Sequence, residues 1–262
     1  MHGTFDATPV VTSPGGVLKA GAYGGSSSIA PATWIEIYGT NLATNLASGE
    51  GHTWGGDDFK GAQAPTSLGG TTVTIGGTSA FVDFVSPGQV NAQVPSGVAT
   101  GFQPVVVTTF GGASTAFNAN VKATEPGILA PPVFKLAAGQ YVAALLSDGT
   151  TFVLPPGTAP GVATARAKPG DIILVYGVGF GPVTPDIAGG LIVQQANSLP
   201  NFAASIGGVN AEVKFAGLVA GFLGLYQFNI VVPQVSANDA SPFVFTLGGV
   251  AGTQKLILPV GN

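Results

Sequence analysis

Cysteine is absent from this chain of 262 residues. Its absence excludes disulfide bonds, catalysis by a thiolate, and zinc or iron–sulfur sites built from cysteine. It leaves the cellular compartment open. Long apolar runs are absent as well. No stretch of about 18 consecutive apolar residues occurs, so the sequence predicts no membrane-spanning helix.

Charged residues are scarce: they make up 8% of the chain, against about 25% in an ordinary globular protein. The net charge is −4, and the eight basic residues are scattered, as Lys19, Lys60, Lys122, Lys135, Arg166, Lys168, Lys214 and Lys255. No basic stripe forms that would neutralise phosphates, which excludes nucleic acid as a partner. Weak charge also means weak repulsion between copies, which favours self-association.

The N-terminus carries no recognisable secretory signal. Its first residues, "MHGTFDATPV", contain neither a basic region nor an apolar core. If the natural protein is secreted, we expect that its signal peptide has been removed and that Met1 is not native.

Hydrophobic residues are abundant, at 45%, and 41 Gly and 20 Pro accompany them. Helical periodicity is nearly absent, whereas apolar and polar residues alternate in "TTVTIGG", "AFVDFV" and "FVFTLGG". This pattern predicts short strands bounded by turns. Asp148-Gly149 predicts a hairpin turn, and the segments 44–70 and 155–170 are predicted to be loops. We therefore expect an all-β fold with little or no helix.

The chain repeats itself. "PATWIEIYGTNL" (31–42) matches "PGDIILVYGVGF" (169–180), and "IGGTSAFVDF" (75–84) matches "IGGVNAEVKF" (206–215). "PGQVNAQVP" and "LYQFNIVVP" then share Gln-x-Asn followed by an apolar run closed by Pro. These landmarks keep one order, which indicates a tandem repeat of one domain. We predict an N-terminal extension at 1–15, a first β-sandwich at 16–123 and a second at 124–262.

The landmarks resemble the IPT/TIG family of immunoglobulin-like domains. Members of that family begin with a strand that ends in a Gly turn, as in "IEIYGTNL", and a V-x-I/V-G-G-x-x-A-x-V hairpin and a strand ending in "VP" follow. Both halves fit this order. The resemblance implies two tandem immunoglobulin-like β-sandwiches.

A narrower resemblance covers the chain from about Gly16 to its end. "IAPATWIEIYGTNLA", "APTSLGGTTVTIGGTSAFVDFVSPGQVNAQVP" and "KPGDIILVYGVGFGPVTP" are similar to an uncharacterised C-terminal domain family that is abundant in soil acidobacteria. That family has no agreed activity and supplies no catalytic residues. Its domains end large exported proteins, which implies an extracellular or cell-surface location.

Four amide side chains repeat at equivalent positions: Gln89 and Asn91 in the first half, Gln227 and Asn229 in the second. Because side chains alternate along a strand, each pair lies on one face, opposite an apolar face. One interpretation is a polar strip that binds sugar. The preferred one is structural: we expect the Asn91 and Asn229 amides to bond the backbone at the ends of their sheets.

Aromatic side chains offer a second candidate site. Trp34, Tyr38, Trp54 and Tyr176 would form either a platform for stacking sugars or packing within the core or at an interface. Both faces of the strand around Tyr176 are apolar, which indicates that one of them covers the linker or the other domain. Packing is the preferred interpretation.

Two metal sites are open to the sequence. Asp57 and Asp58 in the segment 44–70, near Glu50 and Asp83, supply oxygen ligands of the kind that calcium prefers, although their spacing fits no EF-hand loop. The default interpretation is a solvated pair of loop acids. An N-terminal His2 together with His52 would permit a copper site like that of lytic polysaccharide monooxygenases, provided that Met1 were absent.

No catalytic constellation is recognisable, since there is no G-x-S-x-G motif and a serine triad would have to recruit one of only two histidines. The sequence therefore predicts a non-enzymatic extracellular module for structure, adhesion or assembly. It would act on a protein partner or on further copies of itself, without a cofactor apart from the calcium alternative. A carbohydrate-binding module for polysaccharide is the alternative, and a copper oxygenase using His2 and His52 is the third.

Overall fold

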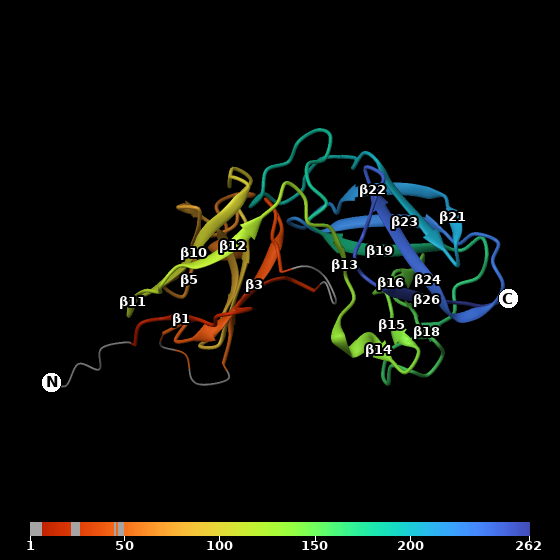
Figure 1. The fold of residues 1–262 in the computed structure, drawn as a ribbon, viewed down its shortest axis with the longest axis horizontal. Coiled ribbons are helices and arrows are strands. Elements are labelled where there is room, and N and C mark those ends of the chain that lie inside the picture. The colour runs from red at the N-terminus through yellow and green to blue at the C-terminus, as the bar shows by residue number, and fades with distance from the viewer. Residues whose placement is uncertain (1–6, 22–26, 45, 47–49) are drawn as a thin grey trace.

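The computed structural model describes residues 7–21, 27–44, 46 and 50–262. Within these residues the regular structure is almost entirely β-strand, and two 3-10 turns, η1 (Gly56–Asp58) and η2 (Pro132–Phe134), are the helical elements. The predicted all-β fold is therefore confirmed. Figure 1 shows an elongated molecule whose early strands lie at one side and whose late strands lie at the other.

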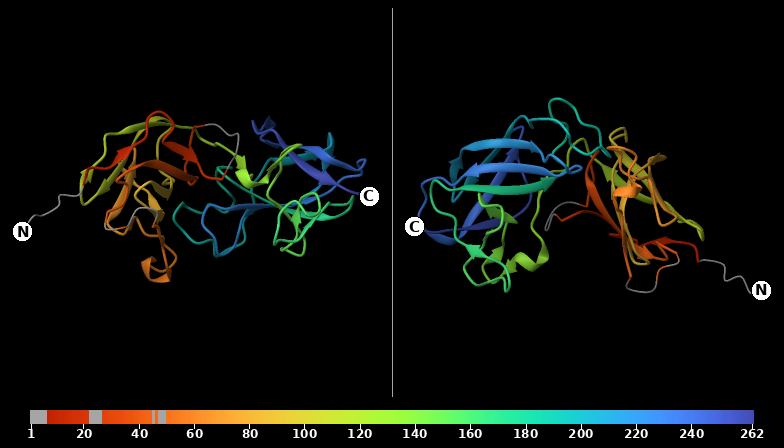
Figure 2. Two further views of the ribbon diagram at one scale, coloured as in Figure 1. Left: turned by 90° about the horizontal axis from the view of Figure 1, so that it is seen from below. Right: turned by 180° about the vertical axis from the view of Figure 1, so that it is seen from behind.

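The two largest clusters of buried hydrophobic side chains are separate from each other. One extends from Val11 to Val121 and the other from Ile128 to Val260. We call the parts around these cores the first half and the second half; both are visible in the two views of Figure 2. The predicted boundary at 123/124 falls between the two cores, and the division into two independent domains stays a prediction.

The first half is a sandwich of two sheets. One sheet contains β1 (Val10–Val11), β2 (Val17–Lys19), β3 (Trp34–Thr40), β9 (Gln89–Gln93), β8 (Phe81–Val85) and β4 (His52–Thr53). The other contains β11 (Gly112–Ala113), β12 (Phe117–Val121), β10 (Gly101–Thr109), β6 (Thr71–Ile75), β7 (Thr78–Ser79) and β5 (Ser67–Leu68). Alternating burial along β6, with Val73 and Ile75 fully buried, is what the alternating sequence predicts.

The second half repeats this arrangement. One sheet contains β13 (Gly127–Ile128), β18 (Thr164–Ala165), β17 (Phe152–Val153), β16 (Ala144–Leu146), β19 (Ile172–Val178), β23 (Tyr226–Val231) and β22 (Val213–Leu218). The other contains β21 (Val209–Ala211), β20 (Phe202–Ile206), β24 (Asn238–Leu247), β25 (Val250–Ala251) and β26 (Leu256–Val260), and β14 (Lys135–Leu136) pairs with β15 (Gly139–Gln140). The predicted turn at Asp148-Gly149 is confirmed, because β16 and β17 pair across it.

The strand pairings agree with the predicted duplication. Tyr38 lies opposite Gln89 in the β3–β9 ladder, and Tyr176 lies opposite Gln227 in the β19–β23 ladder. The irregularity in each neighbouring ladder is repeated too: β8 shifts register just before Phe84, and β22 does so just before its counterpart in the second half. A bulge kept at the same place in both halves indicates a shared ancestor rather than a chance likeness.

The repeat also includes two strands that its sequence landmarks do not reveal. β1 pairs with β3 at Gly39, and β13 pairs with β19 at Gly177. A side chain at Gly39 would overlap the carbonyl oxygen of Val10, and one at Gly177 would come within 2.7 Å of that of Gly127. The repeated Tyr-Gly is thus explained by the close approach of a neighbouring strand.

The predicted N-terminal extension needs correction for this reason. Val10–Val11, inside the range 1–15, forms β1, and the Val11 side chain is buried in the first core. The first sheet therefore begins before residue 16. The sequence did not reveal this because a strand of two residues is too short to show alternation.

Candidate functional site

The four repeated amides make the same hydrogen bond in both halves. Gln89 Nε2 donates to Asn91 Oδ1 at 2.7 Å, and Gln227 Nε2 donates to Asn229 Oδ1 at 2.7 Å. The expected backbone partners were wrong, because side chains two residues apart on one strand face are neighbours and bond each other first. Each bond leaves the amide NH₂ of the Asn and the carbonyl of the Gln available at a half-buried surface.

An aromatic ring lies on either side of each amide pair. We name the resulting surfaces the first amide row, consisting of Tyr38, Gln89, Asn91 and Phe84, and the second amide row, consisting of Tyr176, Gln227, Asn229 and Phe215. All eight side chains are half-buried. Two faces of this kind, on separate sheets, are a repeated feature of the surface rather than one continuous site.

The two tyrosines differ in their surroundings. Tyr38 O–H donates to Glu36 Oε2 at 2.7 Å. Burial raises the pKa of Tyr38 to about 12, and the hydrogen bond to Glu36 adds to the shift. Leu174 occupies the place of Glu36 in the second half, where burial alone raises the pKa of Tyr176. The first amide row is therefore acidic and the second is neutral.

The two tryptophans belong to another cluster, at the contact between the halves. The ring centroids of Trp34 and Trp54 lie 5.6 Å apart at 74°, and those of Trp54 and Phe59 lie 4.9 Å apart at 63°. Rings packed edge to face do not present one flat surface for a sugar to stack on. Trp34 Nε1 donates to the carbonyl oxygen of Leu223 at 2.7 Å, which joins β3 to the second half.

The side-chain amide of Gln93 also joins the two halves. The side chain is fully buried; its Nε2 donates to Ala32 O at 3.0 Å and its Oε1 accepts from Gly190 N–H at 2.6 Å. Gly190 belongs to the second half, and a side chain there would overlap the ring of Phe81. We call the contact between the halves that includes Gln93, Gly190, Trp34 and Leu223 the junction.

Backbone pairing extends the junction. Ala64 N–H donates to Gly190 O at 2.8 Å, and Ile192 N–H donates to Ala62 O at 2.9 Å. The loop predicted at 44–70 therefore contains residues that pair with the second half. The sequence did not predict these contacts, since nothing in a local pattern shows which loop of one half meets which loop of the other.

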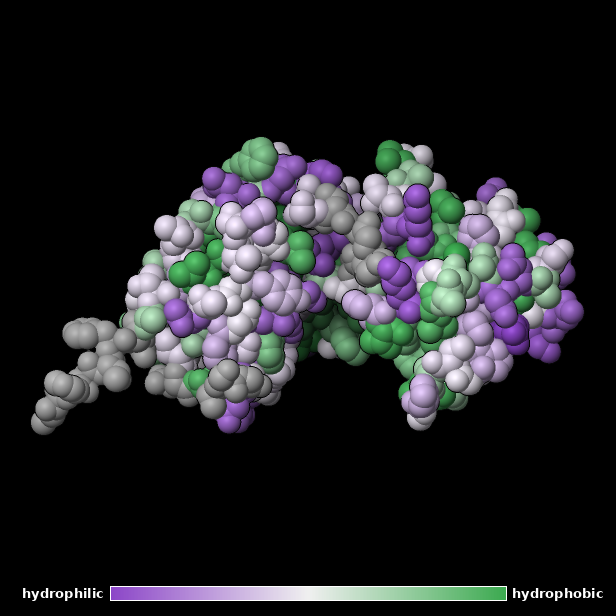
Figure 3. Space-filling model, turned by 60° about the horizontal axis from the view of Figure 1, so that its bottom comes forward, coloured by the Kyte–Doolittle hydropathy of each residue, from purple (hydrophilic) through white to green (hydrophobic). Residues whose placement is uncertain are grey.

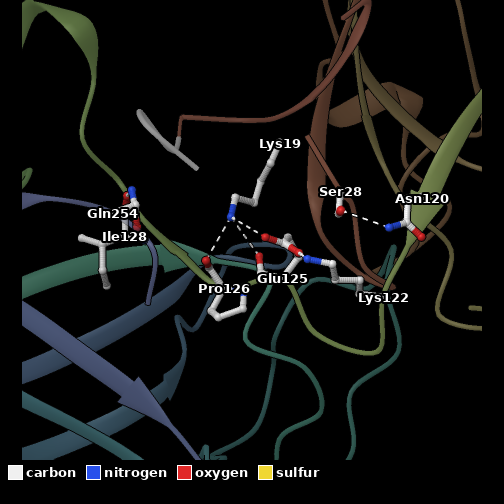
Figure 4. A network of polar contacts seen from close by, with 8 residues as sticks. All are labelled: Lys19, Ser28, Asn120, Lys122, Glu125, Pro126, Ile128 and Gln254. Atoms are coloured by element: carbon white, nitrogen blue, oxygen red, sulfur yellow. Dashed lines mark hydrogen bonds and ion pairs between the residues drawn. The ribbon is translucent and has the colours of Figure 1, made fainter. Parts of the chain in front are cut away.

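A network of polar contacts ties the linker, which is the segment 122–127 between the two cores, to the first half (Figure 4). Lys19 Nζ donates to the carbonyl oxygens of Glu125 and Pro126, at 3.1 and 2.9 Å. The Glu125 carboxylate forms an ion pair with Lys122 at 2.7 Å. Burial lowers the pKa of Lys19 to about 8, against the attraction of Glu125. On the other side of the linker, the Gln254 amide bonds both the N–H and the carbonyl of Ile128.

Two hollows lie beside the linker. A cavity of about 260 Å³ opens between the halves, next to Gln93, and a groove of about 490 Å³ lies between the linker and the turn from β24 to β25. The groove is lined mainly by apolar side chains, including Phe180, Leu199 and Val250. Figure 3 shows the molecule hollowed between its two halves, with hydrophobic surface in the depth of the hollow.

Among the described residues, the candidate metal ligands do not lie close together. Asp58 Oδ2 accepts from Gly55 N–H at 2.7 Å and thereby caps η1, while the Asp57 side chain is exposed. His52 is exposed on β4, and His2 lies outside the described residues. The described part of the chain has no group of three or more His, Cys, Asp or Glu side chains that could hold a metal ion. Calcium at Asp57 and Asp58 stays a prediction.

Asp83 lies apart from these acids, in the bulge of β8. Its backbone carbonyl accepts from Trp54 N–H at 2.9 Å, and its Oδ1 is buried without a hydrogen-bond partner. Burial raises the pKa of Asp83 to about 6.

None of the helical elements in the described residues is long or apolar enough to cross a membrane.

The all-β fold with its antiparallel sheets is immunoglobulin-like, as the sequence predicts. Residues 26–123 match the IPT/TIG domain family, so an IPT/TIG domain is present in the first half. The resemblance seen in the sequence is confirmed there, and the narrower resemblance to an acidobacterial family stays a prediction. No curated protein matches the chain.

The chain is similar to several solved structures, among them the following three. SGBP-B from a Bacteroides ovatus mixed-linkage glucan utilization locus, in complex with a mixed-linkage heptasaccharide, is 11% identical, with a TM-score of 0.36 over 89% of this chain and 42% of that one. SGBP-B from a complex xyloglucan utilization locus in Bacteroides uniformis is 13% identical, with a TM-score of 0.26 over 96% and 49%. The extracellular region of plexin A4 is 10% identical, with a TM-score of 0.26 over 97% and 16%. The chain thus spans less than half the length of each.

Proposed function

We propose that this chain is a non-enzymatic structural and adhesion module that works outside the cell. The junction is the observation that carries the proposal: buried polar and aromatic contacts from Trp34 and Gln93 hold the two halves together. Two halves held in this way present their surfaces at a fixed distance and angle. The IPT/TIG domain and the low charge of the chain support an extracellular module that packs against a partner or another copy.

Distance measurement tests the fixed geometry. Because the chain lacks cysteine, Thr115→Cys and Ser236→Cys supply two exposed positions, one in each half, for spin labels and double electron–electron resonance. We expect one narrow distance distribution, which broadens in a chain that also carries Trp34→Ala. A broad distribution in the otherwise unchanged chain would refute a rigid module. Sedimentation at rising concentration then tests whether copies associate.

A carbohydrate-binding module is the second candidate function. The two amide rows favour it, because each combines amide groups that are free to bond hydroxyls with aromatic rings beside them. Amides and a few aromatic side chains are the groups that fix polar ligands in protein sites. The half-buried state of the rows argues for the structural role instead.

Glycan-array binding separates the two functions. If the rows bind polysaccharide, Asn91→Ala and Asn229→Ala should each weaken binding of a glycan, whereas Asn118→Ala, an exposed Asn on β12, should not. If the rows are structural, glycan binding does not differ between the three variants, and the unfolding midpoint falls slightly in the two row variants alone. Equal glycan binding together with equal unfolding midpoints in all three variants would contradict both roles of the rows.

A further inference from the structure

The cavity beside the junction is formed by both halves together. The first half contributes Ser96, which follows β9, and Pro31, which precedes β3. The second half contributes Asp186 and Ile187, which follow β19, and Tyr226 at the start of β23. The cavity therefore exists only while the halves stay joined.

We propose that this cavity binds one neutral sugar ring, such as a single pyranose unit at the end of a glycan. The site is distinct from the amide rows, and it rests on the first proposed function only in that the junction must hold the halves together. Three features carry the proposal: the size of the cavity, the polar groups that converge on it, and the sign of its charge.

The size fits a small ring. The volume is about 260 Å³, whereas pockets for drug-sized ligands measure roughly 300–1,000 Å³. A single sugar unit is smaller than such ligands, and a longer glycan would extend past the mouth into solvent. Apolar walls from Pro31, Ile187 and Leu191 would contact the C–H faces of the ring.

The polar groups suit hydroxyls. Ser96 Oγ accepts from Gly189 N–H at 2.6 Å, so the hydroxyl is held in place and its own hydrogen remains for a ligand. The Asp186 carboxylate makes no hydrogen bond to another described residue and accepts from as many as four directions. Tyr226 O–H donates to the carbonyl oxygen of Gly181, which leaves the lone pairs of its oxygen as acceptors.

The charge decides the class of sugar. None of the described residues that line the cavity is Lys, Arg or His, and Asp186 is the acidic one. A phosphate, a uronic acid or another anion would meet a carboxylate and no cation. Hydroxyl groups, by contrast, donate readily to a carboxylate, and hydrogen bonds to an ionised acceptor are stronger than neutral ones. A neutral sugar is therefore the ligand that the lining fits.

Saturation-transfer NMR on the full chain tests the proposal. The probes are the methyl glycosides of glucose, galactose, mannose, xylose and arabinose, at about 10 mM, since small polar ligands commonly bind in the millimolar range. Asp186→Asn removes the charge and keeps the size of the side chain, and Ala188→Trp fills the mouth with a bulky ring. Asp57→Asn, which removes an exposed acid from the first half, is the matched control.

At least one glycoside should bind the unchanged chain and the Asp57→Asn control. Asp186→Asn should raise its dissociation constant at least about tenfold, the change expected from losing a hydrogen bond to a charged group. Ala188→Trp should abolish binding at an unchanged unfolding midpoint. The proposal is overturned if no glycoside binds, if binding survives both variants, or if methylammonium binds in place of the sugars. Binding that is lost instead in Asn91→Ala would place the sugar on an amide row and leave carbohydrate binding standing without this cavity.

Discussion

Replacement of Gln93 by Ala should loosen the junction between the two halves. The side chain is fully buried, and its removal leaves the N–H of Gly190 and the carbonyl oxygen of Ala32 without a partner. A buried group left unsatisfied costs about 1–3 kcal/mol. Since the Ala32 bond is only partly buried, we expect a total loss of about 2–4 kcal/mol from the free energy of unfolding.

Gln89→Ala is the matched control for this change. Gln89 lies on the same face of β9, and it bonds the side chain of Asn91 at a half-buried surface. No backbone group is orphaned by its loss, so the cost should stay below about 1 kcal/mol. The comparison therefore isolates the contacts between the halves from the general effect of shortening a Gln on this strand.

Fluorescence reports the junction directly, because the only tryptophans of the chain are Trp34 and Trp54 and both lie there. With a urea slope of about 2 kcal/mol/M, Gln93→Ala should move the fluorescence midpoint down by about 1–2 M. Circular dichroism, which follows the strands of both halves, should move less. Equal midpoints for Gln93→Ala and Gln89→Ala would refute the inference that Gln93 holds the halves together.

Four further substitutions and one control test particular contacts by urea unfolding. Gly39→Ala and Gly177→Ala should each cost about 1–3 kcal/mol, because the new methyl group displaces β1 or β13, whereas Gly56→Ala, which meets nothing within 4 Å, should cost less than about 0.5 kcal/mol. Gly224 has φ +59°, and the methyl group of Gly224→Ala would overlap the Gln93 amide, so this change should weaken the junction. If the loss of unfolding free energy in the double variant equals the full sum of the losses in Gly224→Ala and Gln93→Ala, this reason is contradicted. The raised pKa of Asp83, about 6, means that the folded chain binds more protons than the unfolded chain between about pH 4 and 6, so stability should fall as pH rises through this window. Asp83→Asn should remove that slope and raise stability at pH 7 by about 1–2 kcal/mol after allowance for solvent screening, and an unchanged slope would contradict the assignment.

Strand positions and the repeat were predictable because their signals are local. Alternation marks the buried face of each strand, and paired glycines mark the turns. Gly76 and Gly77 have φ of 59° and 81°, and Gly207 and Gly208 have 59° and 82°, which are the left-handed values that a two-residue hairpin turn requires. Sequence spacing therefore predicted both the hairpins and their equivalence.

The junction was not predictable in the same way. Whether Gln93 bonds solvent, a neighbouring side chain or the backbone of Gly190 depends on how two halves pack, and no local pattern contains that information. One signal was present in the sequence nonetheless. Gln89 and Asn91 repeat in the second half, whereas Val231 stands at the place that corresponds to Gln93. A polar residue that is replaced by an apolar one in the other half is a candidate for a contact that only one half makes.

This difference between Gln93 and Val231 shows that the junction is not a general property of the repeated unit. Trp34 pairs with Gln93 in the β3–β9 ladder, and Ile172 pairs with Val231 in the corresponding ladder of the second half. Ile172 is 36% exposed and has no indole N–H to donate, and Val231 has no amide. A further copy would therefore find on the second half none of the groups that hold the first half in place. The junction joins two unlike surfaces, so it links the two halves of one chain and does not continue into a filament of many copies. Self-association, if the sedimentation experiment detects it, must use a surface other than the counterpart of the junction.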